Sequence, residues 1–261
     1  MGLGIFYFII IILANTIGAI SGMGGGVIIK PALDLVAQSP LSAINFYSSF
    51  AVFVMAIVST AKQIKGGARV NVARTVALSL SAIVGGRLGD ATFRLLSSWF
   101  AAHQVNLIQI ILTLITLIWA LRYAEPRAEA FKVRYPQVVD IAVGLILGWL
   151  ATLLGIGGGP INVALLVFCF NFDIKMATVY SIVIIFFSQL SKLASALPHL
   201  AQDHVELTLL PFILGAAICG GFLGASLNRK FSERAVLRLY RIVVVSVIVL
   251  NAFNGVRLLI G

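Results

Sequence analysis

Long apolar runs separated by short polar segments cover almost the whole chain. The runs fall at 3–37, 41–61, 73–96, 105–122, 138–171, 174–197, 206–228 and 236–260. Six of them have the length of one membrane-crossing helix, for which about twenty residues suffice. The first and the fifth are too long for one ordinary helix. The pattern predicts an all-α polytopic membrane protein.

Each of the two longest runs has a glycine cluster near its middle. Gly22–Gly26 reads Gly-Met-Gly-Gly-Gly, and Gly155–Gly159, which lies 133 residues later, reads Gly-Ile-Gly-Gly-Gly. Glycine is a poor helix former and adopts backbone conformations that are closed to other residues. We therefore expect each run to form a helical hairpin, in which a short second arm returns part of the way.

Other motifs recur at nearly the same spacing. Tyr47-Ser48 returns as Tyr180-Ser181, and Gly86-x-x-Gly89 returns as Gly221-x-x-Gly224. The chain is therefore a tandem duplication, with a first transmembrane repeat over 1–123, a basic linker over 124–137 and a second repeat over 138–261. Each repeat is expected to be a glycine-broken hairpin followed by three transmembrane helices. Halves of this kind are typical of transporters whose substrate site lies between the repeats.

The basic residues bear on the topology, because thirteen of the nineteen Lys and Arg residues lie in the segments 62–74, 122–134 and 229–241. If both glycine-broken runs return to the side they entered, all three segments share one face. The positive-inside rule assigns that face to the cytoplasm. The repeats are then inverted and both termini are external. The alternative is eight simple spans with a parallel repeat.

The composition excludes several classes of function. The chain is 60% hydrophobic and 11% charged, with a mean hydropathy of +1.06, whereas soluble domains carry about 25% charge. The net charge of +10 does not indicate nucleic-acid binding, because the charges lie in short loops. The three histidines lack metal-ligand spacing, and neither a Gly-x-Ser-x-Gly motif nor a phosphate-binding loop is present. We expect no enzyme, no cofactor and no metal.

The glycine clusters are candidates for an anion site. A non-helical turn at membrane depth leaves backbone N–H groups without partners, and a helix that starts there adds its positive dipole end. Such an arrangement suits a small anion. The alternative is that glycine only permits close helix packing.

Polar residues near the clusters extend the candidate site. The candidate substrate-binding residues are Gly22, Gly24, Gly25, Gly26, Asn45, Tyr47, Ser48, Gly155, Gly157, Gly158, Gly159, Asn162, Thr178, Tyr180 and Ser181. The hydroxyls are equally explained by bonds between helices, and Asn162 by capping of the short arm. Lys30, Arg87 and Lys192 are candidates for an electrostatic contribution. Arg87 and Asp90, three residues apart, are expected to form a structural pair.

These motifs resemble the sulfite exporter TauE/SafE family over nearly the whole chain. The matching positions are Gly22, Gly24, Gly25, Gly26, Pro31, Leu33, Ser48, Gly86 and Gly89 in the first half, and Gly155, Gly157, Gly158, Gly159, Pro160, Leu166, Ala177, Ser181, Gly221 and Gly224 in the second. Ile44, Tyr47, Ala164 and Tyr180 depart from the usual pattern. The two tyrosines bear on which substrate the cavity accepts.

The resemblance implies a secondary transporter that exports small sulfur-containing oxyanions, such as sulfite or organosulfonates, from a prokaryotic inner membrane. It implies alternating access with the substrate held at the two glycine breaks, driven by the membrane potential or by a coupled proton or other ion. The alternatives are a passive anion channel and a non-transporting membrane scaffold or enzyme.

Overall fold

The computed structural model describes residues 2–36, 40–68, 70–125, 136–154, 158–197 and 205–260. These residues form ten α-helices and one short 3-10 helix, and no strand occurs among them. The elements are α1 (Gly2–Ser21), α2 (Gly26–Val36), α3 (Leu41–Lys65), α4 (Val72–Trp99), α5 (Ala102–Arg122), α6 (Pro136–Leu153), α7 (Gly159–Phe170), α8 (Ile174–Ala196), η2 (Leu207–Leu209), α9 (Leu210–Lys230) and α10 (Glu233–Ile260). The all-α prediction is confirmed.

Both glycine clusters interrupt helices, as the sequence predicts. α1 ends at Ser21 and α2 begins at Gly26, while α6 ends at Leu153 and α7 begins at Gly159. Gly22, Gly24 and Gly158 have φ angles of 76°, 70° and 73°, in the left-handed region that only glycine adopts freely. Gly155 and Gly157 lie outside the described residues.

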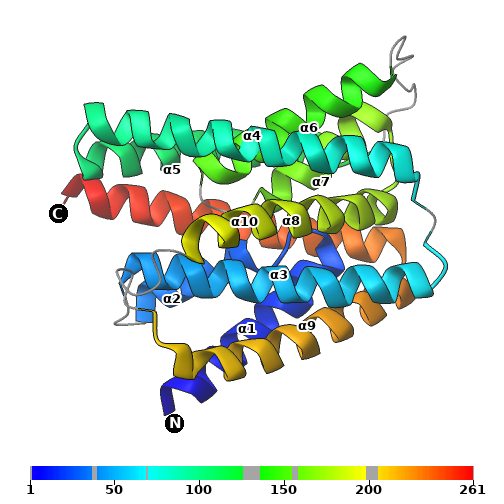
Figure 1. Ribbon diagram of the computed structural model, residues 1–261, viewed down its shortest axis with the longest axis horizontal. Helices are drawn as coiled ribbons and strands as arrows, with labels where there is room; N and C mark the ends of the chain where they lie inside the picture. The colour runs from blue at the N-terminus through cyan, green and yellow to red at the C-terminus, as the bar shows by residue number, and fades with distance from the viewer. Residues whose placement is uncertain are drawn as a thin grey trace.

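The long helices lie side by side and divide the molecule into two ends (Figure 1). α3 and α9 run toward one end, where α4, α6, α8 and α10 begin (Figure 1). We call this the basic end, because α3 and α9 each finish there in basic residues, which are Lys62 and Lys65 in α3 and Arg229 and Lys230 in α9. The opposite end holds both chain termini and the starts of α3 and α5 (Figure 1).

Six of the described helices are long and apolar enough to cross a membrane, namely α1, α3, α5, α8, α9 and α10. α4 is 28 residues long but carries four charged side chains and is not among the six. It nevertheless runs from the basic end to the opposite end, alongside α6 (Figure 1). The charges of α4 therefore lie at the depth of the apolar helices, where a charged group must face protein or water.

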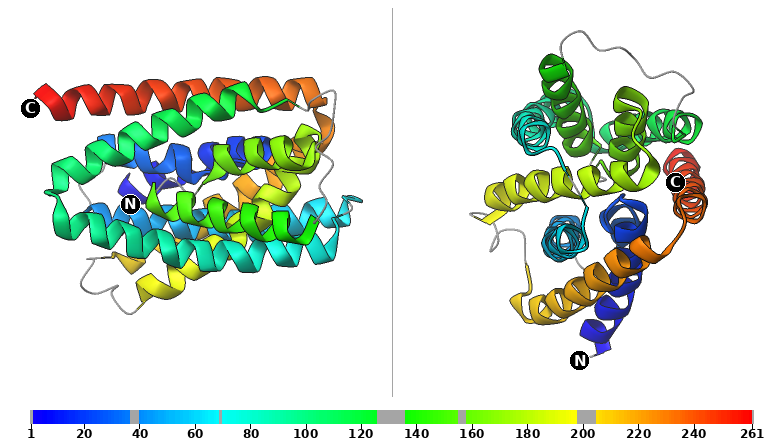
Figure 2. Two further views of the ribbon diagram at one scale, coloured as in Figure 1. Left: turned by 90° about the horizontal axis from the view of Figure 1, so that it is seen from above. Right: turned by 90° about the vertical axis from the view of Figure 1, so that its right-hand side faces the viewer.

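Two helix pairs pack at unusually short range. α4 packs along α6, and α1 packs along α9, with α3 and α8 between the pairs (Figure 2). A Cβ atom on Gly89 would lie 2.5 Å from the carbonyl oxygen of Trp149, and one on Gly224 would lie 2.6 Å from that of Thr16. Real Cβ atoms do not come so close to backbone atoms, so the two Gly-x-x-Gly motifs let these helices approach each other.

Candidate functional site

A cavity of about 460 Å³ lies toward the end of the molecule that is opposite the basic end. Its walls come from the C-terminal halves of α4 and α8, which both end there, and from the first turns of α5 (Figure 1). The lining residues are Lys30, Asn45, Ala82, Gly86, Arg87, Asp90, Phe93, Ser97, Phe100, Val105, Asn106, Gln109, Thr152, Ser188, Ser191, Lys192 and Ser195. The structure thus brings four predicted residues together, which are Lys30, Asn45, Arg87 and Lys192.

The ionisable groups that line the cavity are mostly basic. Lys30, Arg87 and Lys192 line it together with one carboxylate, Asp90. The predicted pair between Arg87 and Asp90 is wrong, because the Asp90 carboxylate accepts a hydrogen bond of 2.6 Å from Arg94, one helical turn further on. Arg94 lies outside the lining and neutralises the carboxylate, so the field in the cavity favours an anion.

One face of α8 carries much of the polar lining, and sequence reasoning missed most of it. Ser188, Ser191, Lys192 and Ser195 stand at positions i, i+3, i+4 and i+7, which share one face of a helix. The hydroxyls of Ser188 and Ser195 donate to carbonyl oxygens of their own helix, at 3.0 Å and 3.2 Å. Both serines still line the cavity, as do Ser191 and Lys192. The i, i+3, i+4, i+7 spacing is the signal that could have found this face.

The inner part of the cavity adjoins the second glycine break. Thr152 lies in the last turn of α6 and lines the cavity. Gln109 of α5 also lines it, and its Nε2 donates a hydrogen bond of 2.7 Å to the carbonyl oxygen of Leu153. That carbonyl belongs to the final residue of α6 and has no partner within the helix. The cavity therefore reaches the point at which α6 stops.

Most of the described glycines of the two breaks are buried inside the protein. Gly22, Gly25, Gly158 and Gly159 are buried, and none of the described glycines of the two clusters lines the cavity. A Cβ atom on Gly159 would collide with the carbonyl group of Met23. The two breaks therefore touch each other near the centre of the molecule.

The predicted tyrosines bind the opposite half of the chain. The Tyr47 hydroxyl accepts a hydrogen bond of 2.7 Å from the backbone N–H of Glu206, just before α9. The Tyr180 hydroxyl accepts one of 2.7 Å from the backbone N–H of Asn71, just before α4. Neither ring lines the cavity. Each tyrosine thus forms a hydrogen bond at the start of a helix from the other half of the chain.

The remaining predicted polar residues are also buried inside the protein. The Ser181 hydroxyl donates a hydrogen bond of 2.6 Å to the carbonyl oxygen of Gly22, and Thr178 donates to Ile174 in its own helix. Ser48 is buried. Asn162 is 1% exposed and does not cap α7, which begins after Gly158 without a side-chain cap. None of these four lines the cavity.

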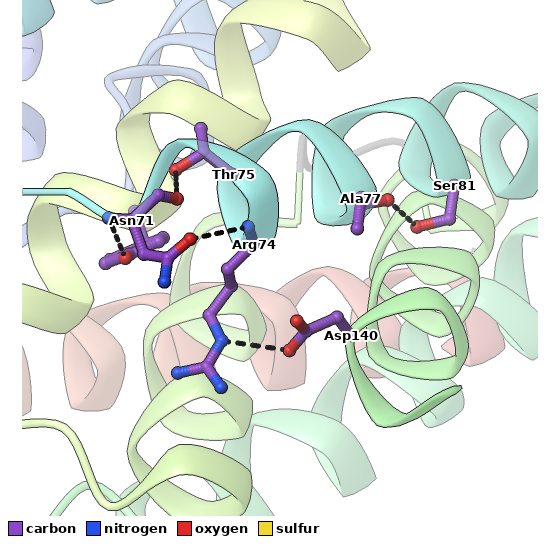
Figure 3. A network of polar contacts seen from close by, with 7 residues as sticks. Asn71, Arg74, Thr75, Ala77, Ser81 and Asp140 are labelled. Carbon is purple, nitrogen blue, oxygen red and sulfur yellow. Dashed lines mark hydrogen bonds and ion pairs between the residues drawn. The ribbon is translucent and has the colours of Figure 1, made fainter. Parts of the chain in front are cut away.

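A polar cluster at the basic end holds α4 in place (Figure 3). The Asn71 side chain accepts a hydrogen bond of 3.0 Å from the backbone N–H of Arg74 and so caps α4. Arg74 donates at 3.0 Å to the carboxylate of Asp140 in α6, and its guanidinium lies 4.6 Å from the centre of the Phe170 ring of α7. α4 is therefore fixed to the second half at the basic end and faces the cavity at the other.

The arrangement agrees with a comparison to known protein families. The family model described as "Sulfite exporter TauE/SafE" matches residues 7–252. The chain belongs to the TauE/SafE sulfite exporter family. It is thus an integral membrane protein of a transporter family, and that family is not a family of enzymes.

A relative supports the TauE/SafE assignment. Over 253 residues the chain is 24% identical to the "Probable membrane transporter protein YunE" of Bacillus subtilis (strain 168). The match covers 90% of this chain and 92% of the relative. The two proteins therefore correspond over nearly their full lengths.

Proposed function

We propose that this TauE/SafE protein exports small sulfur-containing oxyanions, such as sulfite or an organosulfonate, by alternating access. The observation that carries the proposal is the cavity with its basic residues Lys30, Arg87 and Lys192. Arg87 and Lys192 stand on different helices, so an oxyanion between them receives charge-assisted hydrogen bonds from both walls. The Ser191 hydroxyl and the Asn45 amide provide neutral donors for the remaining oxygens.

In this proposal the glycine breaks form the floor on which the anion rests. The second break follows Thr152, which lines the cavity, and the two breaks touch each other through Gly159 and Met23. Because glycine tolerates wide changes in φ and ψ, the floor can change shape as the substrate passes. The substrate therefore contacts the breaks during transport and is held in the observed state mainly by the side chains above them.

The proposed topology places the basic end in the cytoplasm of a prokaryotic inner membrane and both termini outside. Two observations support it. The basic residues that end α3 and α9 lie at one end of the molecule, as the positive-inside rule requires of a cytoplasmic face. Counterpart helices, such as α3 and α8, run in opposite directions (Figure 1), as expected of inverted repeats. The cavity then faces the exterior.

Export of an anion in this geometry does not depend on a coupled ion. A potential that is negative inside drives a singly charged anion outward with about 2.3 kcal/mol per 100 mV. Uniport is therefore the simplest driving arrangement. A coupled proton or other ion would appear as a dependence of flux on its gradient at fixed potential.

Binding is tested by the thermal stability of the purified protein in sulfite, sulfate, sulfoacetate, acetate and chloride. A ligand that binds only the folded state raises stability with concentration. We expect a shift with sulfite or sulfoacetate that is lost in Lys192→Gln and Arg87→Gln. Lys230→Gln removes the same charge at the basic end and is the matched control. Equal shifts in all three variants would reject the cavity as the site.

Transport is tested in proteoliposomes loaded with the anion that binds. A carrier shows a saturable flux and counterflow of labelled substrate, because each passage requires a change of conformation. A flux that stays linear with concentration and shows no counterflow would identify a passive anion channel instead. No flux from folded, anion-binding protein would favour a non-transporting membrane protein.

A further inference from the structure

The cavity wall on α8 has a counterpart on α3, because the two helices are equivalent in the duplication. The spacing of 133 residues that relates Tyr47 to Tyr180 also relates Met55–Lys62 to Ser188–Ser195. In α9, Gly221 and Phe222 correspond in the same way to Gly86 and Arg87 of α4. The surface between α3 and α9 is therefore the counterpart of the cavity between α8 and α4, and it lies toward the basic end.

This counterpart surface is closed. A Cβ atom on Gly221 would lie 2.9 Å from the carbonyl oxygen of Met55 and 3.3 Å from Cβ of Val58. At the rim, Nζ of Lys62 lies 3.1 Å from the centre of the Phe222 ring. That distance is typical of a cation–π contact. α3 and α9 are thus in direct contact at the level where α8 and α4 are separated by the cavity.

Polar groups are nevertheless buried in this half of α3. Ser59, the counterpart of Lys192, is 0% exposed, and Gln63 is 2% exposed. Gln63 Nε2 donates a hydrogen bond of 3.1 Å to the Ser59 hydroxyl, but Gln63 Oε1 has no hydrogen-bond partner among the described residues. A buried amide oxygen without a partner is costly. Its presence is explained if the surface becomes wet in another conformation.

We infer that the surface between α3 and α9 is a second, closed half of the anion pathway. Ser59, Gln63 and Lys62 form its polar lining when it opens toward the basic end. Lys62, released from Phe222, then supplies a cation to an anion that enters from that side. This inference rests on the proposed function and adds the entry site for the same class of small anion.

The inference is tested by the accessibility of single cysteines to a membrane-impermeant maleimide. Val58→Cys reports on the surface between α3 and α9, and Ser191→Cys, at the equivalent position of α8, is the matched control. Both are placed in a background in which Cys169 and Cys219 are alanine. Membrane vesicles of each orientation expose one end of the protein at a time.

We expect maleimide to label Ser191→Cys from the end that holds the termini and Val58→Cys from the basic end. Phe222→Ala removes the contact with Lys62 and should speed labelling of Val58→Cys about two- to fivefold, the population change that loss of a cation–π contact allows. Ser59→Cys is a second reporter if Val58→Cys does not fold.

Labelling of Val58→Cys from the same end as Ser191→Cys would overturn the inference. So would an absence of labelling at both Val58→Cys and Ser59→Cys in folded protein that carries Phe222→Ala. The labelling needs no knowledge of the substrate. Failure of anion binding in the stability assay would therefore reject the proposed function, and failure of labelling with anion binding intact would reject only the second pathway.

Discussion

Gly86 of α4 and Gly221 of α9 occupy equivalent positions in the two repeats but have different neighbours. A Cβ atom on Gly221 would touch α3 at two places, whereas one on Gly86 would meet only Thr152 and Gly148 of α6 within 4 Å. α8, the counterpart of α3, lines the cavity together with Gly86 and has no atom within 4 Å of that Cβ position. One interface is thus closed and its counterpart is open.

The difference suits a transport mechanism in which two interfaces open in turn. Packed interfaces have discrete arrangements and do not deform continuously, so equivalent helix pairs can occupy different arrangements in one structure. Each pair remains joined at one end by a tyrosine, since Tyr180 holds the start of α4 and Tyr47 holds the segment before α9. We propose that the two interfaces exchange their open and closed arrangements during transport.

The largest effect is expected when a bulky side chain replaces the glycine at either interface, as a wedge between the helices. Gly221→Leu should prevent the closed arrangement of α3 and α9, and Gly86→Leu should prevent closure of the cavity. Overpacking of about 1–3 kcal/mol should lower flux roughly ten- to a hundredfold in both variants. Flux is measured in proteoliposomes, with Gly215→Leu in α9 as a folding control.

The two wedges should differ in cysteine labelling although both reduce flux. Gly221→Leu should increase labelling of Val58→Cys from the basic end, and Gly86→Leu should abolish it while Ser191→Cys remains labelled. Identical labelling patterns in the two variants would show that the interfaces do not alternate.

Exchange of the side chains beside these glycines sharpens the comparison. Arg87→Phe gives the open side the residue that Phe222 supplies on the closed side. Loss of one charge-assisted hydrogen bond should raise the Kd of the anion roughly ten- to a hundredfold. Titration calorimetry measures the change, and Arg234→Phe, which removes a charge at the basic end, is the control. An unchanged Kd would remove Arg87 from the binding site.

The ends of α1 and α6 offer a comparison of stability. Asn228 Nδ2 donates a hydrogen bond of 2.6 Å to the carbonyl oxygen of Ile20, as Gln109 does to that of Leu153. Asn228 is 4% exposed, so Asn228→Ala leaves a buried carbonyl unpaired and should cost about 1–3 kcal/mol. Gln109→Ala should cost less, because water in the cavity can replace the amide. Chemical denaturation of both variants measures the difference. Equal losses in the free energy of unfolding would contradict the access of cavity water to the end of α6.

The smallest expected effect concerns the two tyrosines. Tyr47→Phe and Tyr180→Phe each remove one hydrogen bond to a backbone N–H at the start of a helix. Each should lower the free energy of unfolding by about 0.5–1.5 kcal/mol, and the two losses should be similar if the contacts are equivalent. Denaturation curves of the two variants provide the test. A much larger loss of unfolding free energy in one variant would show that the two contacts are not equivalent.

The sequence predicted the helices and their breaks closely, because these depend on local properties. Apolar runs of about twenty residues can only form helices in a bilayer, and glycine clusters interrupt them wherever they stand. The ends of α1 and α2 on either side of Gly22–Gly25 follow from this alone. The repeated motifs also sufficed to indicate the family.

The candidate site was predicted only in part. Lys30, Asn45, Arg87 and Lys192 were expected near the substrate and do line the cavity. The serines of α8 were missed, because the choice of the helix face that turns toward the cavity depends on how α8 packs against α3 and α4. The pairing of Asp90 with Arg94 was missed for a related reason, since two basic neighbours were available on one helix.

The sequence alone therefore determined an all-helical membrane protein whose two longest apolar runs are interrupted by glycine clusters. Only the tertiary structure decided that the breaks touch each other, that the tyrosines cross between the halves and that one interface is closed while the other encloses a cavity. Helix formation is governed by residues within a few turns of one another. The state of an interface is governed by contacts between helices far apart in the chain, and two equivalent surfaces can satisfy those contacts in different ways.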